Sequence, residues 1–301
     1  MVPLRYLFSL LLGAALFAAP PTSHAAALFA APPTSHAAAL FGAPPQRVVS
    51  QTVGTDELLL ALADPSQIAA LSHLAKDPVF SPVAKEAASY PCLRTSDAES
   101  ILKFHPDLVL IASYTRAETK ALLQRTGVKL LVLEKFESLD DLYANARIIG
   151  SALGHSDRAE VAILNWQQRV AALQKRLKGA RPVRVLPAST FPFTAGADTT
   201  FQDVCEHAGA LNVAAEAGLK GHQATPTEKL LTWNAEVLVA SGEEGIRVIE
   251  RLRELPSYKF LPAMKAGRVV LVSGPRMAST AQARLDAYEE LARALHPERF
   301  K

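Results

Sequence analysis

From residue 47 onward the sequence alternates short apolar runs with amphipathic stretches, and this alternation limits the fold more than any other feature. The apolar runs predict strands at residues 48–49, 68–71, 108–112, 129–133, 183–187, 237–240 and 269–272. The stretches between them predict helices at 56–63, 97–104, 116–125, 139–153, 201–208, 227–232, 245–254 and 280–295. Nearly continuous apolar strands separated by helices are typical of a parallel sheet covered on both faces. The sequence therefore predicts an α/β protein with Rossmann-like, parallel sheets.

One predicted helix is longer than the others and separates the chain into two halves. It spans residues 156–178, where Ser156 can cap its start and Gly179 can end it. Apolar side chains three or four residues apart form one face, namely Ile163, Trp166, Val170, Leu173 and Leu177. A helix of about 23 residues is roughly 34 Å long, which is the size of a domain. We therefore predict an α/β lobe over residues 47–155, a bridging helix over 156–179 and a second α/β lobe over 180–301.

The two predicted lobes share a local sequence pattern. Residues 96–104 and 107–110 match residues 225–233 and 236–239 at a constant offset of 129 positions. A shorter match, of Arg47-Val48-Val49 with Arg184-Val185-Leu186, has the similar offset of 137. These matches predict two lobes related by duplication. A cleft between two such lobes is the expected place for a ligand.

Residues 1–46 have a different composition, because Arg5 is their only charged residue. An apolar run at 7–19 is too short to span a bilayer and is followed by the small-residue segment Ser23-His24-Ala25. Residues 15–26 recur unchanged at 27–38. This pattern predicts a signal peptide over residues 1–37, with cleavage after Ala25 or after Ala37. No cysteine precedes Cys92, so we expect a soluble protein of the periplasm and not a lipoprotein.

The charge and the motifs of the remaining 255 residues argue against several functions. These residues carry 31 basic and 29 acidic side chains, a balance that does not predict a nucleic-acid partner. They contain no His-x-x-x-His or Cys-x-x-Cys pair, no glycine-rich phosphate loop and no Gly-x-Ser-x-Gly elbow, so we do not expect an enzyme. A chelatase-like enzyme or a zinc- or manganese-binding protein remains an alternative. Either would have to bring scattered histidines together, namely His73, His155, His207 and His222.

Glu99 and Glu228 occupy matching positions in the two repeated segments. Each lies three residues after a hydroxyl side chain, Ser96 or Thr225, which predicts a capping box at the start of a helix. Pro226 also suits the first position of such a helix. As a pair, the two carboxylates would equally suit docking on a two-fold partner that presents basic residues.

The only two cysteines are Cys92 and Cys205. A disulfide between them and two free thiols are both compatible with the sequence. A buried apolar thiol is the commoner role for a cysteine in a helix, which is where Cys205 is predicted to lie.

Four segments of the chain resemble a known family. They are RVVS…TDELLLALA at 47–63, AESILKFHPDLVLIA at 98–112, FTAGADTT at 193–200 and HAGALNVAAEAG at 207–218. Together they are similar to the periplasmic binding proteins of ABC importers for metal chelates, which serve cobalamin, haem and ferric siderophores. The resemblance implies two α/β lobes joined by one long helix and a monomer without an intrinsic cofactor. It also implies that Glu99 and Glu228 dock on an inner-membrane permease dimer.

The resemblance further implies a set of ligand contacts from both lobes. Carried over to this sequence, they are Gln51, Thr52, His73, Leu74, Tyr90, Cys92, Arg94, Phe191, Phe193, His222 and Arg276. Phe191 and Phe193 would form a stacking wall for a flat ligand or would be core residues. Arg94 and Arg276 would bind carboxylate or phosphate groups if they face the cleft.

The sequence departs from the family at residues that distinguish the ligands. Haem-binding members usually have an iron-ligating Gly-Tyr pair where this chain has Pro91-Cys92. Cobalamin-binding members have cleft aromatics at positions that are Leu74, Leu93 and His222 here. Tyr90, with Cys92 and His222, is an alternative set of iron ligands. A ferric siderophore, haem and cobalamin therefore all remain candidates for the ligand.

Overall fold

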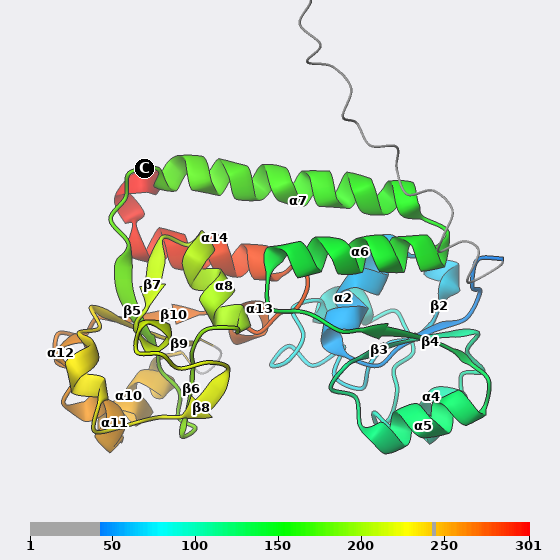
Figure 1. The fold of residues 1–301 in the computed structure, drawn as a ribbon, viewed down its shortest axis with the longest axis horizontal. Helices are drawn as coiled ribbons and strands as arrows, with labels where there is room; N and C mark the ends of the chain where they lie inside the picture. The colour runs from blue at the N-terminus through cyan, green and yellow to red at the C-terminus, as the bar shows by residue number, and fades with distance from the viewer. Residues whose placement is uncertain (1–42, 243–244) are drawn as a thin grey trace, which may run out of the picture. The chain divides into compact units, whose positions relative to one another are not determined.

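The computed structural model of the protein describes residues 43–242 and 245–301 (Figure 1). The predicted signal peptide and its two cleavage sites lie outside the described residues. Among the helices of the described ranges, none is both long enough and apolar enough to cross a membrane.

The first sheet has four parallel strands in the order β2-β1-β3-β4. These strands are β1 (Val48–Ser50), β2 (Ile68–Ala70), β3 (Leu108–Ala112) and β4 (Lys129–Leu133). The helices of this lobe are α2 (Val53–Leu62), α3 (Ala84–Ala87), α4 (Ala98–Leu102), α5 (Ala117–Arg125) and α6 (Leu139–Leu153), with a 3-10 turn η1 (Pro65–Gln67). Every residue of β3 is buried, as the apolar run at 108–112 predicts for a strand covered on both faces.

The second sheet also has four parallel strands, in the order β10-β9-β5-β7. They are β5 (Val183–Pro187), β7 (Ala210–Asn212), β9 (Val237–Ser241) and β10 (Val269–Val272). Two further strands of this lobe, β6 (Phe193–Ala195) and β8 (His222–Ala224), form a separate antiparallel sheet. The helices are α8 (Thr200–His207), α9 (Val213–Glu216), α10 (Ile246–Glu254), α11 (Pro256–Lys259), α12 (Pro262–Lys265), α13 (Gly274–Met277) and α14 (Arg284–Leu295), with 3-10 turns η2 (Leu230–Trp233) and η3 (Pro297–Phe300). The predicted α/β class with parallel sheets is confirmed.

The two lobes have the same topology, which extends the sequence match to the backbone. Numbered by appearance within each lobe, both sheets follow the order 2-1-3-4. β3 and β9 begin 129 positions apart, as the sequence match does. Val48 pairs with Leu108 in the first sheet and Val185 with Val237 in the second, so matched residues occupy the same register.

The two lobes also share a hydrogen bond from an arginine next to the first strand of each sheet. Arg47 Nη2 donates to the carbonyl of Phe104 at 2.6 Å, and Arg184 Nη2 donates to the carbonyl of Trp233 at 2.8 Å. The next residues, His105 and Asn234, both have left-handed backbones, with φ of 47° and 52°. A shared αL turn closed by an arginine supports a duplicated origin for the two lobes.

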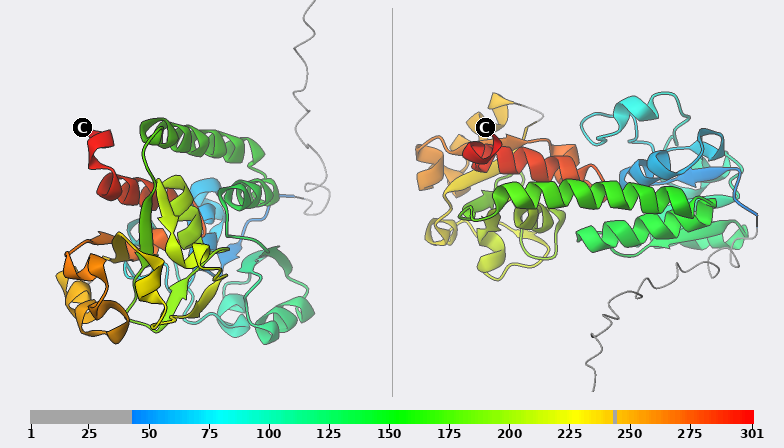
Figure 2. Two further views of the ribbon diagram at one scale, coloured as in Figure 1. Left: turned by 60° about the vertical axis from the view of Figure 1, so that its left-hand side comes forward. Right: turned by 90° about the horizontal axis from the view of Figure 1, so that it is seen from above.

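The long helix α7 (Ser156–Leu177) runs beside α6 and α14, as the view from above shows (Figure 2). It buries the predicted apolar face through Ile163, Trp166, Leu173 and Leu177. The predicted cap at its start is wrong, because Ser156 is the first helical residue and His155 precedes it without a side-chain cap. Arg169 on the polar face forms an ion pair with Asp286 of α14 at 2.7 Å.

The predicted helix at 227–232 is also wrong. Residues 227–229 form a turn that leads into η2. Two backbone hydrogen bonds in the turn and η2 join residues three apart, which is the 3-10 pattern. They run from Lys229 N–H to Pro226 O and from Thr232 N–H to Lys229 O. The strands β6, β7 and β8 were not predicted, because their sequences FTA, ALN and HQA contain no continuous apolar run.

Candidate ligand-binding site

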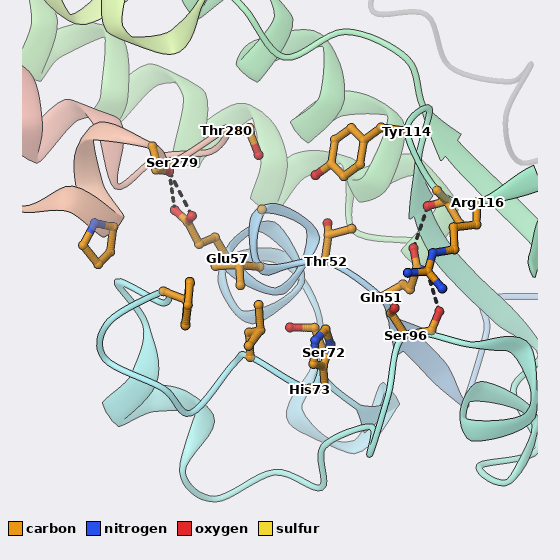
Figure 3. A pocket seen from close by; sticks show the side chains of 17 residues that line it. Gln51, Thr52, Glu57, Ser72, His73, Ser96, Tyr114, Arg116, Ser279 and Thr280 are labelled. Atoms are coloured by element: carbon orange, nitrogen blue, oxygen red, sulfur yellow. Dashed lines mark hydrogen bonds between the residues drawn. The ribbon is translucent and has the colours of Figure 1, made fainter. Parts of the chain in front are cut away.

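A cavity of about 390 Å³ lies between residues of the two lobes (Figure 3). Its N-lobe wall comes from segments that directly follow three strands. Gln51 and Thr52 follow β1, Ser72 to Leu74 follow β2, and Tyr114 to Arg116 follow β3. The C-lobe wall is the segment after β10, through Pro275, Ala278, Ser279 and Thr280.

The N-lobe wall coincides with the switch point of the first sheet. The chain leaves β1 toward β2 on one side and reaches β3 on the other, so the carboxyl ends of β1 and β3 border a crevice. Gln51 spans this crevice, because its Oε1 accepts from Thr115 Oγ1 at 2.6 Å and its Nε2 donates to Ser96 O at 2.8 Å. Ligands of open α/β sheets bind at such crevices.

The start of α2 is fixed by hydroxyl side chains that border the cavity. Thr52 is the N-cap, and its Oγ1 accepts from the N–H of Thr55 at 3.3 Å. Thr55 Oγ1 in turn accepts from the N–H of Thr52 at 3.1 Å, which completes a capping box. This local sequence holds Thr52 at the cavity and directs α2 toward the C-lobe.

Glu57 of α2 is the contact between that helix and the C-lobe wall. Its side chain is fully buried and accepts hydrogen bonds from Ser279 Oγ at 2.9 Å and from the N–H of Ala283 at 3.0 Å. Burial raises the pKa of Glu57 to about 7, although these donors act in the opposite direction. The carboxyl group is thus committed to the C-lobe and not to a ligand.

The neighbouring residue, Asp56, holds the segment after β2. It is fully buried and accepts from the N–H of Ser72 at 2.9 Å and from Ser72 Oγ at 2.5 Å. Burial raises its pKa to about 7 as well. Asp56 thereby fixes Ser72 where it lines the cavity.

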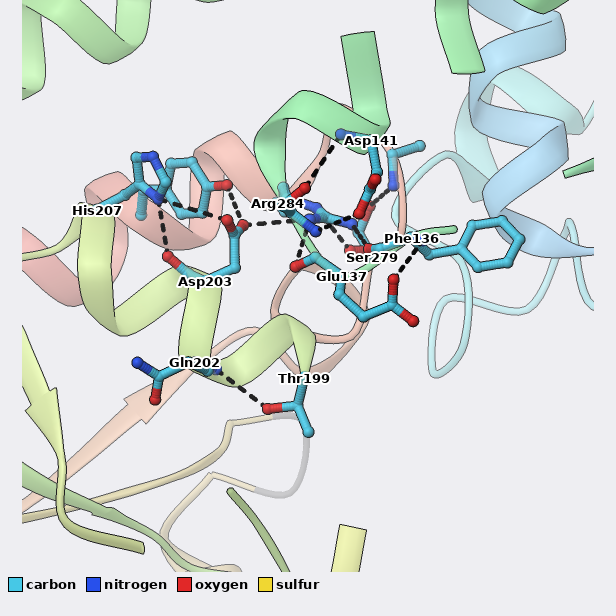
Figure 4. A network of polar contacts seen from close by, with 12 residues as sticks. Phe136, Glu137, Asp141, Thr199, Gln202, Asp203, His207, Ser279 and Arg284 are labelled. Carbon is cyan, nitrogen blue, oxygen red and sulfur yellow. Dashed lines mark hydrogen bonds and ion pairs between the residues drawn. The ribbon is translucent and has the colours of Figure 1, made fainter. Parts of the chain in front are cut away.

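Arg284, at the start of α14, connects the two lobes (Figure 4). Its fully buried guanidinium donates to the carbonyls of Phe136 and Glu137, in the connection between β4 and α6, at 2.5 and 3.4 Å. It also donates to Ser279 O at 3.1 Å and pairs with Asp203 Oδ2 at 3.1 Å. One side chain therefore positions the C-lobe wall against the N-lobe.

The network extends in two directions from Arg284. Tyr288 also donates to Asp203, and the His207 ring stacks on Tyr288 with 4.6 Å between ring centroids. On the other side, Phe136 contacts the ring of Tyr114, a cavity residue, at 5.6 Å between centroids.

Four of the eleven ligand contacts implied by the resemblance line the cavity: Gln51, Thr52, His73 and Leu74. Tyr90 and Cys92 are half-buried and pack against the hydrophobic core, and Cys92 pairs with Leu71 at the edge of β2. Arg94 is exposed and does not line the cavity.

The four C-lobe contacts implied by the resemblance also lie outside the cavity lining. Phe191 and Phe193 are 74% and 55% exposed, so neither is a core residue. His222 is exposed on β8, opposite Ala195 of β6. Arg276 is half-buried and forms ion pairs with Glu290 and Asp286. Its charge is therefore already balanced within the C-lobe.

Several cavity residues were not identified from the sequence. Tyr114, Thr115 and Arg116 directly follow the predicted strand at 108–112, and the strand-end rule alone would have selected them. Ser279 and Thr280 carry no such signal, because only the packing of α14 against the N-lobe brings them to the cavity.

The capping boxes predicted for Glu99 and Glu228 do not form. Asp97 caps α4 instead, accepting from the N–H of Ser100 at 2.8 Å, because α4 begins one residue later than that pattern requires. Glu228 lies in the turn before η2, where no α-helix begins. Both side chains are exposed, and Glu99 forms an ion pair with Lys103 of its own segment, at 3.1 Å.

The described residues contain no cluster of the side chains that most often bind a bare metal ion. No three His, Cys, Asp or Glu side chains gather in a metal-binding arrangement within 43–242 and 245–301. His155 contacts Gln67 and His207 contacts Asp203, so the scattered histidines stay apart. Both cysteines are free, with Cys205 buried as expected for an apolar thiol in a helix. The zinc and chelatase alternatives therefore gain no support here.

Two α/β lobes of the same strand order, a long bridging helix and a cavity at strand ends define a two-lobed solute-binding protein. The periplasmic binding protein family matches residues 48–274, and the chain belongs to this family. Its members are substrate-binding components of transport and not enzymes.

Individual relatives are distant. An ABC transporter substrate-binding lipoprotein of Bacillus subtilis, YvrC, is 23% identical over 222 residues, covering 68% of this chain and 67% of the relative. A cobalamin-binding protein of Halobacterium salinarum is 24% identical over 260 residues, covering 83% and 69%. The apo structure of the haem-binding protein RhuT from Roseiflexus sp. RS-1 has a TM-score of 0.73 at 22% identity, covering 84% of this chain and 99% of that one.

Proposed function

We propose that this protein captures a metal chelate outside the cytoplasmic membrane and delivers it to the permease of an ABC importer. The observation that carries the proposal is the cavity at the β1/β3 switch point, closed by the C-lobe segment after β10. The relatives named as a cobalamin-binding and a haem-binding protein support a metal chelate as the ligand. A ferric siderophore, haem and cobalamin are the candidate ligands.

We further propose that the mature protein is soluble in the periplasm and acts as a monomer. The sequence before Cys92 offers no lipid-attachment cysteine, in contrast to the name of the Bacillus relative, which is a lipoprotein. The extensive interlobe contacts of Glu57 and Arg284 support a largely preformed cavity whose lobes close by small motions.

The surface that we propose docks on the permease includes Glu99 and Glu228. They are separated by the same 129 positions that relate β3 to β9, so they occupy matching positions of the repeated segments, with Glu99 on α4 and Glu228 in the turn before η2. Both carboxylates are exposed and free of capping roles. Two equivalent acidic groups suit a permease dimer that presents one basic site per subunit.

Reversing both charges, as Glu99→Lys with Glu228→Lys, is expected to abolish importer-dependent uptake and to leave ligand affinity unchanged. Like charges would then face each other at two docking contacts at once. The measurement compares uptake of radiolabelled hemin, cyanocobalamin or ferric siderophore by cells with calorimetric Kd values of the purified variant. A control variant, Glu160→Lys with Glu298→Lys, makes the same charge change on exposed residues of α7 and η3. Undiminished uptake, or an equal fall in affinity, would rule out the docking role.

A further inference from the structure

We infer that the ligand is an anionic chelate whose acidic oxygens bind Arg116 at the N-lobe wall of the cavity. This inference rests on the proposed function and narrows the class of ligand. It selects against neutral chelates, whatever metal they carry.

Arg116 lies where two hollows of the N-lobe meet. A second hollow of about 280 Å³ adjoins the cavity, and Arg116, His73 and Ser96 line both. Figure 3 shows Arg116 and Ser96 on the same side of the cavity, beside Gln51. A group bound to the guanidinium can therefore belong to a ligand that occupies the main cavity.

Within the described residues, the guanidinium of Arg116 has no counter-ion of its own. Over the described ranges, its side chain makes no ion pair and no hydrogen bond to the protein. Two C-lobe arginines contrast with it, because Arg276 is paired with Glu290 and Arg284 with Asp203. A cation that lines a hollow without a protein partner is placed to bind an anion.

The carboxyl groups near Arg116 are occupied by other donors. Asp97, which lines the second hollow, accepts from Thr95 Oγ1 at 2.5 Å and from the N–H of Ser100 at 2.8 Å. These bonds, led by that from Thr95, hold the pKa of Asp97 below its ordinary value. Glu57, in the main cavity, is bound to Ser279 and Ala283. Neither carboxyl group is bonded to Arg116.

Uncharged donors surround the same place. Thr119 lines the second hollow with only 7% of its surface exposed, and within the described chain its hydroxyl has no hydrogen-bond partner. Thr119 lies in the first turn of α5, whose N-cap position is Arg116 itself, with no side-chain cap on the free N–H groups. The hydroxyl and the positive end of α5 both favour a negatively charged group.

The planar guanidinium fits a pair of acidic oxygens. Arginine binds carboxylate or phosphate through two parallel N–H···O bonds, and the paired oxygens of a catecholate present the same geometry. Haem carboxylates and tris-catecholate iron complexes carry such groups, whereas a neutral ferric tris-hydroxamate does not. The site therefore distinguishes chelates by charge.

The test is calorimetric titration of the wild type, Arg116→Gln and Arg116→Lys with hemin, a ferric tris-catecholate and a neutral ferric tris-hydroxamate. Arg116→Gln is expected to weaken binding of an anionic probe about 10- to 100-fold, as for loss of a charge-assisted hydrogen bond, with partial recovery in Arg116→Lys. Arg125→Gln, which changes an exposed arginine in the last turn of α5 and outside the cavity lining, serves as the control and should leave the Kd unchanged. Because Arg116 is exposed and unpaired, its variants should fold normally, as an unchanged Tm would verify.

The possible results separate this inference from the proposed function. An anionic probe that binds Arg116→Gln as tightly as the wild type would overturn the inference and leave the function standing. So would binding of the neutral chelate alone. Binding of no chelate at all would overturn both.

Discussion

Replacing Arg284 by methionine is expected to lower the free energy of unfolding by about 3–5 kcal/mol, because Asp203 would be left as a buried charge without its partner. The change would also leave the carbonyls of Phe136, Glu137 and Ser279 without their shared donor. Chemical denaturation of the purified variant measures the loss. Because Arg284 joins the two lobes, we expect ligand binding to fall together with stability.

Two variants give this prediction its controls. Arg147→Met removes an arginine whose salt bridge to Glu160 is half exposed, and it should cost less than about 1 kcal/mol. Asp203→Asn in the Arg284→Met background removes the uncompensated charge and should restore part of the stability. If Arg284→Met destabilised the protein no more than Arg147→Met, the interlobe network would not have the role described here.

Substituting alanine for Gly54 is expected to weaken ligand binding at least tenfold, because the new methyl group would collide with the opposite lobe. A Cβ at Gly54 would lie 1.9 Å from Thr280 Oγ1 and 3.3 Å from Thr280 Cβ. Gly54 lies near the start of α2 and Thr280 on the C-lobe wall, so the collision would separate the two walls of the cavity. Calorimetric Kd values for hemin, cyanocobalamin and a ferric siderophore measure the effect.

A second substitution separates this collision from an effect on the helix. Alanine favours a helix over glycine by about 1 kcal/mol, so Gly54→Ala alone should not destabilise α2. In the Gly54→Ala background, Thr280→Ala removes the colliding oxygen and is expected to restore most of the affinity. Wild-type affinity in Gly54→Ala alone would show that the close approach of Gly54 to Thr280 does not fix the two walls of the cavity.

The sequence predicted the sheets well where apolar runs are long. The strands at 108–112, 129–133, 183–187 and 269–272 and the helix at 139–153 have the bounds observed for β3, β4, β5, β10 and α6. Prediction failed where tertiary contacts decide the structure. The capping pattern at Thr225 does not start a helix, because residues 225–226 continue from β8 and Thr227 is instead hydrogen-bonded to Ser257.

Only part of the candidate site could be predicted, because tertiary contacts place some of its residues. Gln51 and Thr52 directly follow a strand, so their place at the cavity is local in origin. Ser279 and Thr280 reach the cavity because Arg284 and Glu57 hold the segment before α14 against the N-lobe, and no local pattern encodes these contacts. The C-lobe aromatic positions that the resemblance implied, Phe191 and Phe193, remain exposed outside the cavity lining.

The most direct test of the account is whether the purified protein binds a metal chelate rather than a bare metal ion. Titration calorimetry suits this test better than tryptophan fluorescence, because neither Trp166 of α7 nor Trp233 of η2 lines the cavity. The wild type is titrated with hemin, cyanocobalamin, ferric siderophores and zinc chloride. We predict one-to-one binding of at least one chelate and no specific binding of zinc. Tight binding of zinc, with none of the chelates bound, would contradict it.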